Sequence, residues 1–266
     1  MRHPIITLLT DFGLKDHYVA SMKGVILGIN PRCTVVDISH QVAPQDVEEG
    51  AFVLAAAFTS FPPGTIHLGV VDPGVGGPRR PLLVVTEDYY FVGPDNGLFS
   101  LALRRENIKR LIVPTNKSYF LPRTSSTFHG RDVFVPVAAH LSLGVRPESF
   151  GSRTGACVEL RFNRPGRKGE ELTGEIIHVD AFGNLVSNID EENLFDFVRD
   201  RLFSVRVDRY RVRGLKGGYW EGRKGEVLAL IGSGGFLEIA VREGNARKRL
   251  KAGRGDRVRI RIEKGR

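Results

Sequence analysis

The first half of the chain alternates short apolar runs with segments of helical spacing, and no other feature constrains the fold as strongly. Strands that alternate with helices in this way are typical of α/β layers. The expected strands cover 5–10, 33–38, 65–72, 81–87 and 89–96, and the expected helices begin near Asp16 and cover 46–58, 97–105 and 133–143. We therefore predict an N-terminal α/β domain with a largely parallel sheet.

From about residue 157 the pattern changes to short runs in which apolar and polar residues alternate between glycine-rich turns. The runs are VELRF, ELTGEIIHVD, LFSVRVDRYRV, EVLALIG, GFLEIAV and RVRIRI. A period of two describes strands with one buried face, and this arrangement is typical of a small antiparallel β-barrel or sandwich. We predict an α/β domain over 1–162, a polar linker over 163–171 and a β-barrel domain over 172–266.

The formal charge of +9 on 266 residues suggests a nucleic-acid partner at first sight. The charge is local, because residues 247–266 contain ten Lys and Arg and only two acids. In this stretch Val258, Ile260 and Ile262 alternate with arginines, as in a strand with one solvent face. We favour a barrel or edge strand protected by charge over a phosphate-binding stripe, since the stretch has no aromatic residue to stack bases. We expect no nucleic-acid partner.

Composition excludes several other classes of protein. A content of 41% hydrophobic and 26% charged residues is ordinary for a globular chain and too apolar for disorder. Cys33 and Cys157 are far apart, which argues against a disulfide framework or zinc cluster and fits a reducing cytoplasm. No apolar run approaches the roughly 20 residues of a membrane span, and Asp11 comes too early for a signal peptide. We expect a cytoplasmic protein without membrane contact.

Three acidic, glycine-flanked turns follow expected strands of the α/β domain. They are TDFGLKD (10–16), VVDPGVGGPRR (70–80) and GPDNG (93–97). In open α/β sheets the carboxyl ends of the strands line the ligand crevice. One such aspartate is commonly a turn or helix cap, but three at one edge predict a pocket lined by carboxylates. TDFG is not the magnesium motif of protein kinases, because the other kinase motifs are missing.

A fourth loop, FHGRD (128–132), places His129 beside Gly130 just before an expected helix. Together, Asp72, Arg79 and His129 would form a water-activating set. The carboxylate would orient a water, the permanent cation would favour hydroxide, and the imidazole titrates near neutrality. A metal-dependent hydrolase that uses Asp11, Asp72 and His129 is a weaker alternative.

Two turns of the expected barrel carry candidate binding residues. DAFGNLVSN (180–188) combines Asp180, Phe182 and Asn184. An amide can read an adenine edge by paired hydrogen bonds and Phe182 can stack on a purine, but a plain turn with a buried Phe is also open. The turn GSGGF (232–236) offers backbone N–H groups of the kind that capture a carboxylate.

In chain order these motifs closely resemble the S-adenosyl-L-methionine hydroxide adenosyltransferases. The matching segments are TDFGLKDHYVASMKG, VVDISH, DVEEGA, FPPGTIHLGVVDPGVG, RR, GPDNG, TFHGRD and DAFGN. These enzymes are S-adenosylmethionine hydrolases related to fluorinating and chlorinating enzymes, and the resemblance covers nearly the whole chain. It implies an α/β domain followed by a β-barrel. It also implies a homotrimer whose sites join one subunit's N-terminal domain to its neighbour's C-terminal domain.

The resemblance also implies roles for individual residues. Asp72, Arg79 and His129 match the water-handling triad, with Arg80 as an adjacent alternative to Arg79. The matches for substrate binding are Asp11 at the ribose hydroxyls, Asp16 and Asp180 at the methionine amino group, Asn184 and Phe182 at adenine, and Ser233 at the methionine carboxylate. Tyr18 replaces a small hydroxyl residue and Gln45 replaces a Trp near the ribose. Halogenating relatives carry Tyr at the position of Asp72 and Ser at that of Gly130, so this chain favours water over halide.

The expected reaction is attack of water or hydroxide on C5′ of S-adenosyl-L-methionine, which releases adenosine and L-methionine without a metal or other cofactor. The sulfonium leaves as a neutral thioether and needs no general acid, so alignment of the nucleophile is the main task, and proximity can lower such barriers by about 7–11 kcal/mol. Two alternatives are halide transfer in the same pocket and a non-catalytic protein that binds adenosine or S-adenosylmethionine. The carboxylates Asp11, Asp16, Asp72 and Asp180 suit a small, positively charged substrate.

Overall fold

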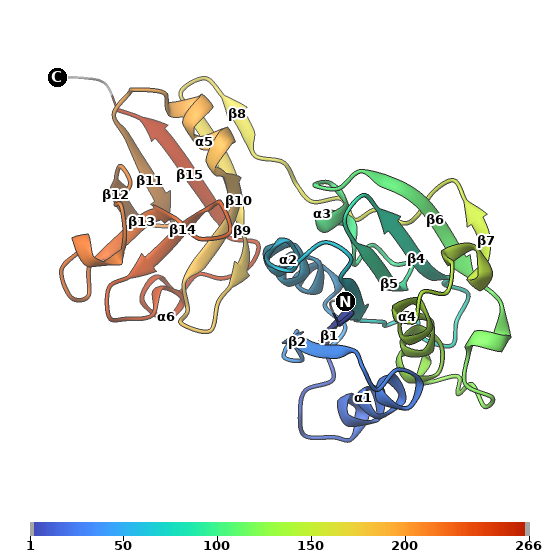
Figure 1. Cartoon of the computed structure of the whole chain (residues 1–266). Coiled ribbons are helices and arrows are strands. Elements are labelled where there is room, and N and C mark those ends of the chain that lie inside the picture. Colours follow the sequence, from blue (N-terminus) through green and yellow to red (C-terminus); the bar gives the residue numbers. More distant parts are fainter. Residues whose placement is uncertain (1–2, 264–266) are drawn as a thin grey trace. The chain divides into compact units, whose positions relative to one another are not determined.

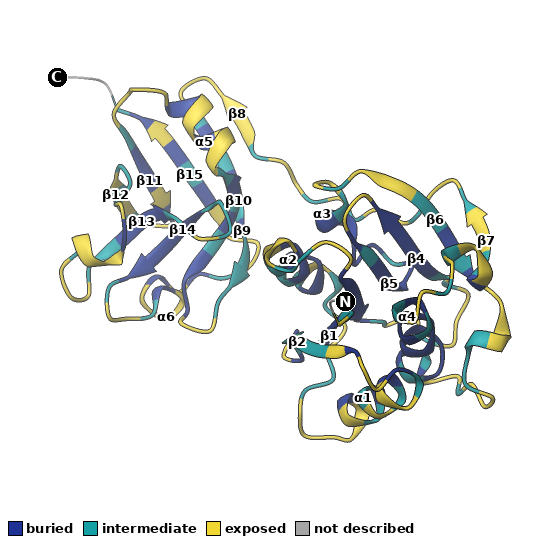
Figure 2. Cartoon of the chain, viewed as in Figure 1, coloured by how far each residue is buried: buried dark blue, intermediate teal, exposed yellow. Residues whose placement is uncertain are grey.

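The computed structural model describes residues 3–263. The chain divides into two compact units, Met1–Leu160 and Arg161–Arg266, and each has its own hydrophobic core. The first combines helices with a sheet and the second consists mainly of strands (Figure 1). In both units the buried residues follow the central strands, and the exposed residues gather at turns and outer helix faces (Figure 2).

The first unit is built on a seven-stranded sheet with the order β2-β1-β3-β5-β4-β6-β7. The strands are β1 (Ile5–Thr10), β2 (Thr34–Ser39), β3 (Ile66–Val70), β4 (Pro81–Thr86), β5 (Tyr90–Pro94), β6 (Ile108–Pro114) and β7 (Gly151–Thr154). From β2 to β5 the strands pair in parallel, and from β5 to β7 they pair antiparallel. The α/β class is confirmed, but the sheet is mixed rather than largely parallel. Residues 87–89 join β4 to β5, and so short a connection permits only a hairpin.

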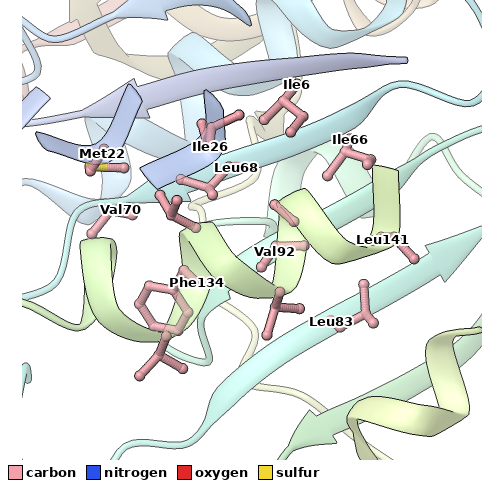
Figure 3. Packing of buried hydrophobic residues seen from close by; sticks show 14 of the residues in the cluster. Ile6, Met22, Ile26, Ile66, Leu68, Val70, Leu83, Val92, Phe134 and Leu141 are labelled. Atoms are coloured by element: carbon pink, nitrogen blue, oxygen red, sulfur yellow. The ribbon is translucent and has the colours of Figure 1, made fainter. Parts of the chain in front are cut away.

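The strands β1, β3, β4 and β5 are buried on both sides, because helices cover both faces of this sheet. On one face α1 (Tyr18–Ile29) packs against α4 (Val135–Ser142), over a cluster that includes Met22, Leu68 and Phe134 (Figure 3). A second buried cluster contains residues of α2 (Val47–Ala57) and α3 (Ser100–Leu103). They pack with the strand residues that alternate with those of the first cluster. The shorter helical turns are η1 (Phe58–Ser60), η2 (Lys117–Tyr119), the π-helical η3 (Gly130–Phe134) and η4 (Pro147–Phe150).

The sequence patterns place most of these elements correctly but miss part of the sheet. No pattern predicts β6 or β7, since both are partly exposed and lack a continuous apolar run. The helix expected over 97–105 is only the four residues of α3. The helix expected from Val133 is preceded by the π-helical turn, which begins at Gly130 and carries His129 at its N-cap.

The second unit is an antiparallel sheet with the order β12-β11-β15-β9-β10-β14-β13, and β8 pairs with β9. The strands are β8 (Gly166–Lys168), β9 (Glu171–Val179), β10 (Leu185–Asp190), β11 (Phe203–Val207), β12 (Tyr210–Arg213), β13 (Val227–Ile231), β14 (Phe236–Val241) and β15 (Arg257–Ile262). The helices are α5 (Glu191–Val198), η5 (Tyr219–Glu221) and α6 (Ala246–Leu250). The end strands β12 and β13 approach each other, so the sheet curls into a near-barrel.

Three expectations for this region change. Residues 158–162 (VELRF) form no strand. The stretch 163–171, expected as a linker, contains β8 and the turn to β9. β15 lies between β11 and β9 with Val258 and Ile260 fully buried, so it is an interior strand of the near-barrel and not an edge strand. Edge protection therefore does not explain its arginines. None of the helices within 3–263 has the length and apolar character needed to cross a membrane.

Candidate active site

The strand order of the first unit brings the three acidic turns to one edge of the sheet. Asp11 directly follows β1, Asp72 lies two residues after β3, and Asp95 directly follows β5. β4 runs in the opposite direction, so its first residue, Pro81, pairs with the last residue of β5 at the same edge. The two arginines that precede β4 therefore begin beside the acidic turns.

At this edge Asp72, Arg79 and His129 are in direct contact. Arg79 Nε donates to both carboxylate oxygens of Asp72 at 3.0 Å, and Arg79 Nη2 lies 2.5 Å from Oδ2. The same Nη2 lies 2.9 Å from Nδ1 of His129. The side chains of Asp72 and Arg79 are only 4% and 11% exposed. The three residues form one row with the guanidinium in the middle, which we call the Asp72–Arg79–His129 row.

Arg79 determines which nitrogen of His129 carries the proton. A guanidinium can only donate, so Nδ1 accepts and the ring proton of the neutral imidazole lies on Nε2. Burial lowers the pKa of His129 and the charge of Arg79 lowers it further, while Asp72 and Asp132 act in the opposite sense. His129 is therefore a neutral imidazole at neutral pH, with an Nε2–H group that can donate.

Glycines shape the loop that places Arg79 in the row. Gly76 has a φ of +75°, and a Cβ there would lie 2.2 Å from the carbonyl oxygen of Ser126. A Cβ at Gly74 would lie 3.1 Å from Cγ of Arg79. At Gly76, only glycine permits both the left-handed backbone and the close approach to Ser126. The guanidinium also lies 5.1 Å above the ring of Phe134, a cation–π contact that fixes its position.

The adjacent Arg80 turns to a different partner. Its Nη2 lies 2.5 Å from Oδ2 of Asp95, and its guanidinium also donates to Thr154 Oγ1 and to the carbonyl of Ala156. Asp95 is 2% exposed at its side chain and accepts a further hydrogen bond from Val158 N–H. The third acidic turn therefore anchors residues 154–158 with its carboxylate. Of the two arginines, Arg79 is the one that contacts Asp72 and His129.

The loop after β1 is held by the segment after β2. Asp11 Oδ2 accepts from the backbone N–H of Gln45 at 2.7 Å, and Gly13 N–H donates to the carbonyl of His40 at 2.7 Å. His40 is 4% exposed, and its Nδ1 pairs with Thr10 Oγ1 at 2.8 Å. These contacts position the half-buried Asp11.

Aromatic rings join this loop to the segment that carries His129. The ring of Tyr18 lies 5.2 Å from that of Phe128 and 5.7 Å from that of Phe12, and Phe12 lies 5.8 Å from Phe128. Tyr18 is 39% exposed and Asp16 is exposed. The loops that carry Asp11 and His129 are thus joined through the packed rings of Phe12, Tyr18 and Phe128.

A cleft of about 690 Å³ in the first unit reaches Arg79 and His129. Its other walls include Lys117 and Leu121, from the segment that follows β6. Sequence reasoning did not identify these residues, because β6 was not expected and the segment carries no motif. The cleft gives solvent access to Arg79 and His129.

In the second unit, Asp180 and Asn184 form one tight turn. Asp180 Oδ1 accepts from the backbone N–H groups of Phe182 and Asn184 at 2.9 and 2.8 Å, and Oδ2 accepts from Asn184 Nδ2 at 2.9 Å. Asn184 is 7% exposed, whereas Phe182 is 77% exposed. The alternative of a buried Phe is therefore wrong. A hollow of about 580 Å³ beside the turn is lined by Asp180, Gly183 and Arg247.

Ser233 lies exposed in the turn between β13 and β14. Gly232 N–H and Gly235 N–H donate to Phe236 and Gly232 carbonyls at 2.9 Å. Within residues 3–263, the N–H groups of Ser233 and Gly234 donate to no acceptor. Two donors of this turn are therefore available to an anion such as a carboxylate.

The described part of the chain has no group of three or more His, Cys, Asp and Glu side chains arranged to hold a metal ion. Asp11, Asp72 and His129, the set of the metal-dependent alternative, form no such group. The carboxylate of Asp72 instead takes three contacts from Arg79.

Both units of the chain match models of one protein family. Residues 6–151 match the SAM hydroxide adenosyltransferase N-terminal domain, and residues 174–259 match the C-terminal domain of the same family. A curated relative from Thermus thermophilus, named (R)-S-adenosyl-L-methionine hydrolase, is 38% identical over 96% of this chain and 98% of its own length. A fluorinase from Nocardia brasiliensis is more distant, with 27% identity over 73% of each chain.

A solved structure of an uncharacterized conserved protein from Thermotoga maritima has a TM-score of 0.91 and 38% identity, covering 96% of this chain and 99% of its own. The two family models together span most of the residues that form both units, including the loops of the Asp72–Arg79–His129 row and the Asp180 turn. The chain therefore belongs to the SAM hydroxide adenosyltransferase family.

Proposed function

We propose that this protein hydrolyses S-adenosyl-L-methionine to adenosine and L-methionine. The observation that carries the proposal is the direct contact of Asp72, Arg79 and His129 at a solvent-accessible edge of the sheet. The name of the T. thermophilus relative, (R)-S-adenosyl-L-methionine hydrolase, supports the same substrate. Family membership alone would not choose between water and halide, and the chemistry of the row supports water.

In the proposed reaction, the oxygen of water forms a bond to C5′ while the bond from C5′ to the sulfonium sulfur breaks. The electron pair of that bond goes to sulfur, which leaves as the neutral thioether of methionine. The water loses one proton to solvent. No metal, oxidant or other co-reactant is needed for this balance.

The residues of the row divide the work of aligning the water. The Asp72 carboxylate accepts a hydrogen bond from the water and directs a lone pair at C5′. His129 Nε2–H and the Arg79 guanidinium donate to the oxygen and favour its hydroxide form. Because Asp72 is already paired with Arg79, we assign it an orienting role and not that of a strong base.

Substrate binding is proposed for the remaining motif residues. Asp11 would accept from the ribose hydroxyls, and Asp16 and Tyr18 would lie near the methionine part. In the second unit, the exposed ring of Phe182 would stack on adenine and the Asn184 amide oxygen would accept from its amino group. Asp180 and Ser233 would bind the amino and carboxylate groups of methionine.

Halide transfer is the second candidate reaction. Gly130, where halogenating relatives have Ser, has room for a Cβ, which would meet Val70 Cγ1 at 3.4 Å and Met22 Sδ at 3.7 Å. Steric exclusion therefore does not explain the missing hydroxyl. Asp72 would repel a halide at the position where it favours water. Incubation with chloride should give adenosine and no 5′-chloro product.

We also propose that the chain assembles as a homotrimer, with each substrate bound between two subunits. The proposal is supported only by the resemblance to the family. Light scattering on the purified protein should give three times the chain mass of 29.5 kDa. A monomeric or dimeric mass would contradict it.

Incubation in ¹⁸O-water tests the hydrolysis. We expect the label in the 5′-hydroxyl of adenosine and not in methionine. Arg79→Lys should reduce kcat strongly, whereas Arg80→Lys, which alters a neighbouring arginine outside the row, serves as the matched control. Tight binding of S-adenosylmethionine without turnover would instead identify a binding protein, and unlabelled adenosine would exclude attack by water.

A further inference from the structure

Three arginines of the second unit face one another across neighbouring strands. The strands β12, β11 and β15 are adjacent in the sheet (Figure 1). Arg206 in β11 is paired with Arg211 in β12 on one side and with Arg259 in β15 on the other. Adjacent strands are about 4.8 Å apart, and like charges directly opposite each other destabilise a sheet. Since β15 is an interior strand, edge protection does not account for this concentration of positive charge.

The chain itself neutralises only one of these three arginines. Arg211 Nη2 lies 2.6 Å from Oε1 of Glu263. Arg206 Nε donates to the backbone carbonyl of Asp208 at 2.7 Å. In the part of the chain that the structure describes, no carboxylate forms an ion pair with Arg206 or Arg259. The charges of these two guanidinium groups are therefore open to an anion from outside the chain.

A hollow of about 390 Å³ lies beside Arg206 and Arg259. Arg257, two residues earlier in β15, lines the same hollow and also forms no ion pair with any described residue. Lys251, the residue that ends α6, lines it as well. Four cations from three separate segments of the chain therefore meet at one hollow.

The charge and size of the hollow restrict which anion it suits. Two acids, Asp208 and Asp256, also line it, and Asp256 Oδ2 already accepts from the backbone N–H of Gly253 at 2.8 Å. The four cations and two acids leave two positive charges in excess. A phosphate group of a monoester carries a charge of about −1.5 to −2 at neutral pH. The described residues of this lining include no aromatic side chain, so a nucleic-acid base has nothing to stack on.

We propose that this hollow binds a dianionic phosphate group, either free phosphate or the phosphate of a small monoester. Guanidinium groups match phosphate oxygens with two parallel hydrogen bonds, and a lysine ammonium adds a point charge. Bound phosphate also relieves the repulsion between Arg206 and Arg259. The site lies in the second unit and does not depend on the proposed hydrolysis.

Calorimetry on the full-length protein in a phosphate-free buffer tests the site with two probes, inorganic phosphate and glycerol 3-phosphate. Arg259→Gln keeps a polar side chain but removes the charge. We expect this variant to bind the probes about tenfold or more weakly than wild type, as for a lost charge-assisted hydrogen bond. Tighter binding of glycerol 3-phosphate than of phosphate would identify a monoester as the ligand, and equal affinities would identify free phosphate as sufficient.

Arg261→Gln is the matched control. Arg261 lies two residues further along β15, does not line the hollow, and has Ser204 opposite it in place of an arginine. It loses the same charge, and both affinities should stay within about twofold of wild type, because no contact to the ligand is lost. Without ligand, Arg259→Gln should keep or raise the melting temperature, since it removes a like-charge pair. A lower melting temperature would assign Arg259 a structural role and overturn the proposal.

Lys251→Gly is a second variant that should fold, because Lys251 has a φ of +55°, a conformation that glycine adopts freely. It should also weaken binding of both probes. Three results would contradict a phosphate site: no binding of either probe, equal weakening by Arg259→Gln and Arg261→Gln, or binding of a single-stranded oligonucleotide without binding of either small probe. The last result would identify a nucleic-acid surface instead.

Discussion

The two regions that carry the candidate binding chemistry are built in opposite ways. In the first unit, the Asp72–Arg79–His129 row joins residues up to 57 positions apart, through contacts between separate loops. In the second unit, Asp180, Phe182 and Asn184 lie within five consecutive residues, and the turn's own hydrogen bonds hold them. The row depends on the packing of the whole unit, whereas the turn depends on local backbone geometry. Substitutions in the row should therefore affect catalysis and stability together, and those in the turn should affect binding alone.

The largest effect is expected from Asp72→Asn. The amide preserves size but removes the charge that pairs with Arg79 and orients the water. We expect kcat to fall about 100-fold or more, as for loss of the group that aligns the nucleophile. KM should change little, because Asp72 does not hold the substrate. Steady-state release of adenosine measures both constants, and a kcat close to wild type would remove Asp72 from the mechanism.

Gly76→Ala tests whether the row depends on loop geometry. The new Cβ would meet the Ser126 carbonyl at 2.2 Å at a backbone φ of +75°. We expect a lower melting temperature and a kcat reduced about tenfold or more, since small misplacements of catalytic groups are costly. Gly144→Ala is the control, because its φ is +89° but its Cβ would meet nothing within 4 Å. Equal effects on Tm would show that backbone strain, and not the close approach, matters at Gly76.

Phe182→Ala tests the local turn. The ring is 77% exposed, so its loss should leave the melting temperature unchanged. Base–aromatic stacking is worth about 1–3 kcal/mol, so KM should rise about tenfold with kcat nearly constant. An unchanged KM would show that the ring does not contact the substrate. A large loss of stability would contradict the independence of the turn from the surrounding packing.

The smallest effect, a gradual pH dependence, should come from the row. Burial and the charge of Arg79 lower the pKa of His129 from 6.5, so the neutral ring persists to lower pH. Protonation of Nδ1 would break its contact with Arg79, and kcat should decline only as the pH falls below about 6.5 and through the lowered pKa. Measurement of kcat between pH 4.5 and 8 records this decline. A kcat that rises on acidification would reverse the assigned protonation state.

The sequence predicted the order of elements more reliably than their pairing. Apolar runs and helical spacing placed β1 to β5, α1 and α2 within a few residues, because buried faces impose these periods on the chain. The hairpin of β4 and β5 and the two further strands changed the sheet from largely parallel to mixed. Strand pairing was not predicted because it is set by connection length and by contacts between distant segments. The further strands were missed because exposed strands such as β7 carry a weak apolar signal.

The candidate site shows the same division. Sequence motifs singled out Asp11, Asp72 and His129, and the resemblance added their expected roles. The motifs could not distinguish Arg79 from Arg80, since both follow the same turn. The fold separates them, because one guanidinium reaches Asp72 and His129 and the other reaches Asp95.

By itself, the sequence determined which chemical groups this protein has and which family it resembles. Its local turns need particular residue types, such as glycine at a positive φ, and these types can be recognised in the sequence. Only the tertiary structure decided which groups meet, which nitrogen of His129 accepts a hydrogen bond, and which acids are already neutralised by an arginine. The physical reason is that hydrogen bonds and ion pairs act over a few ångströms in space, and neighbours in space are fixed by packing and not by position along the chain.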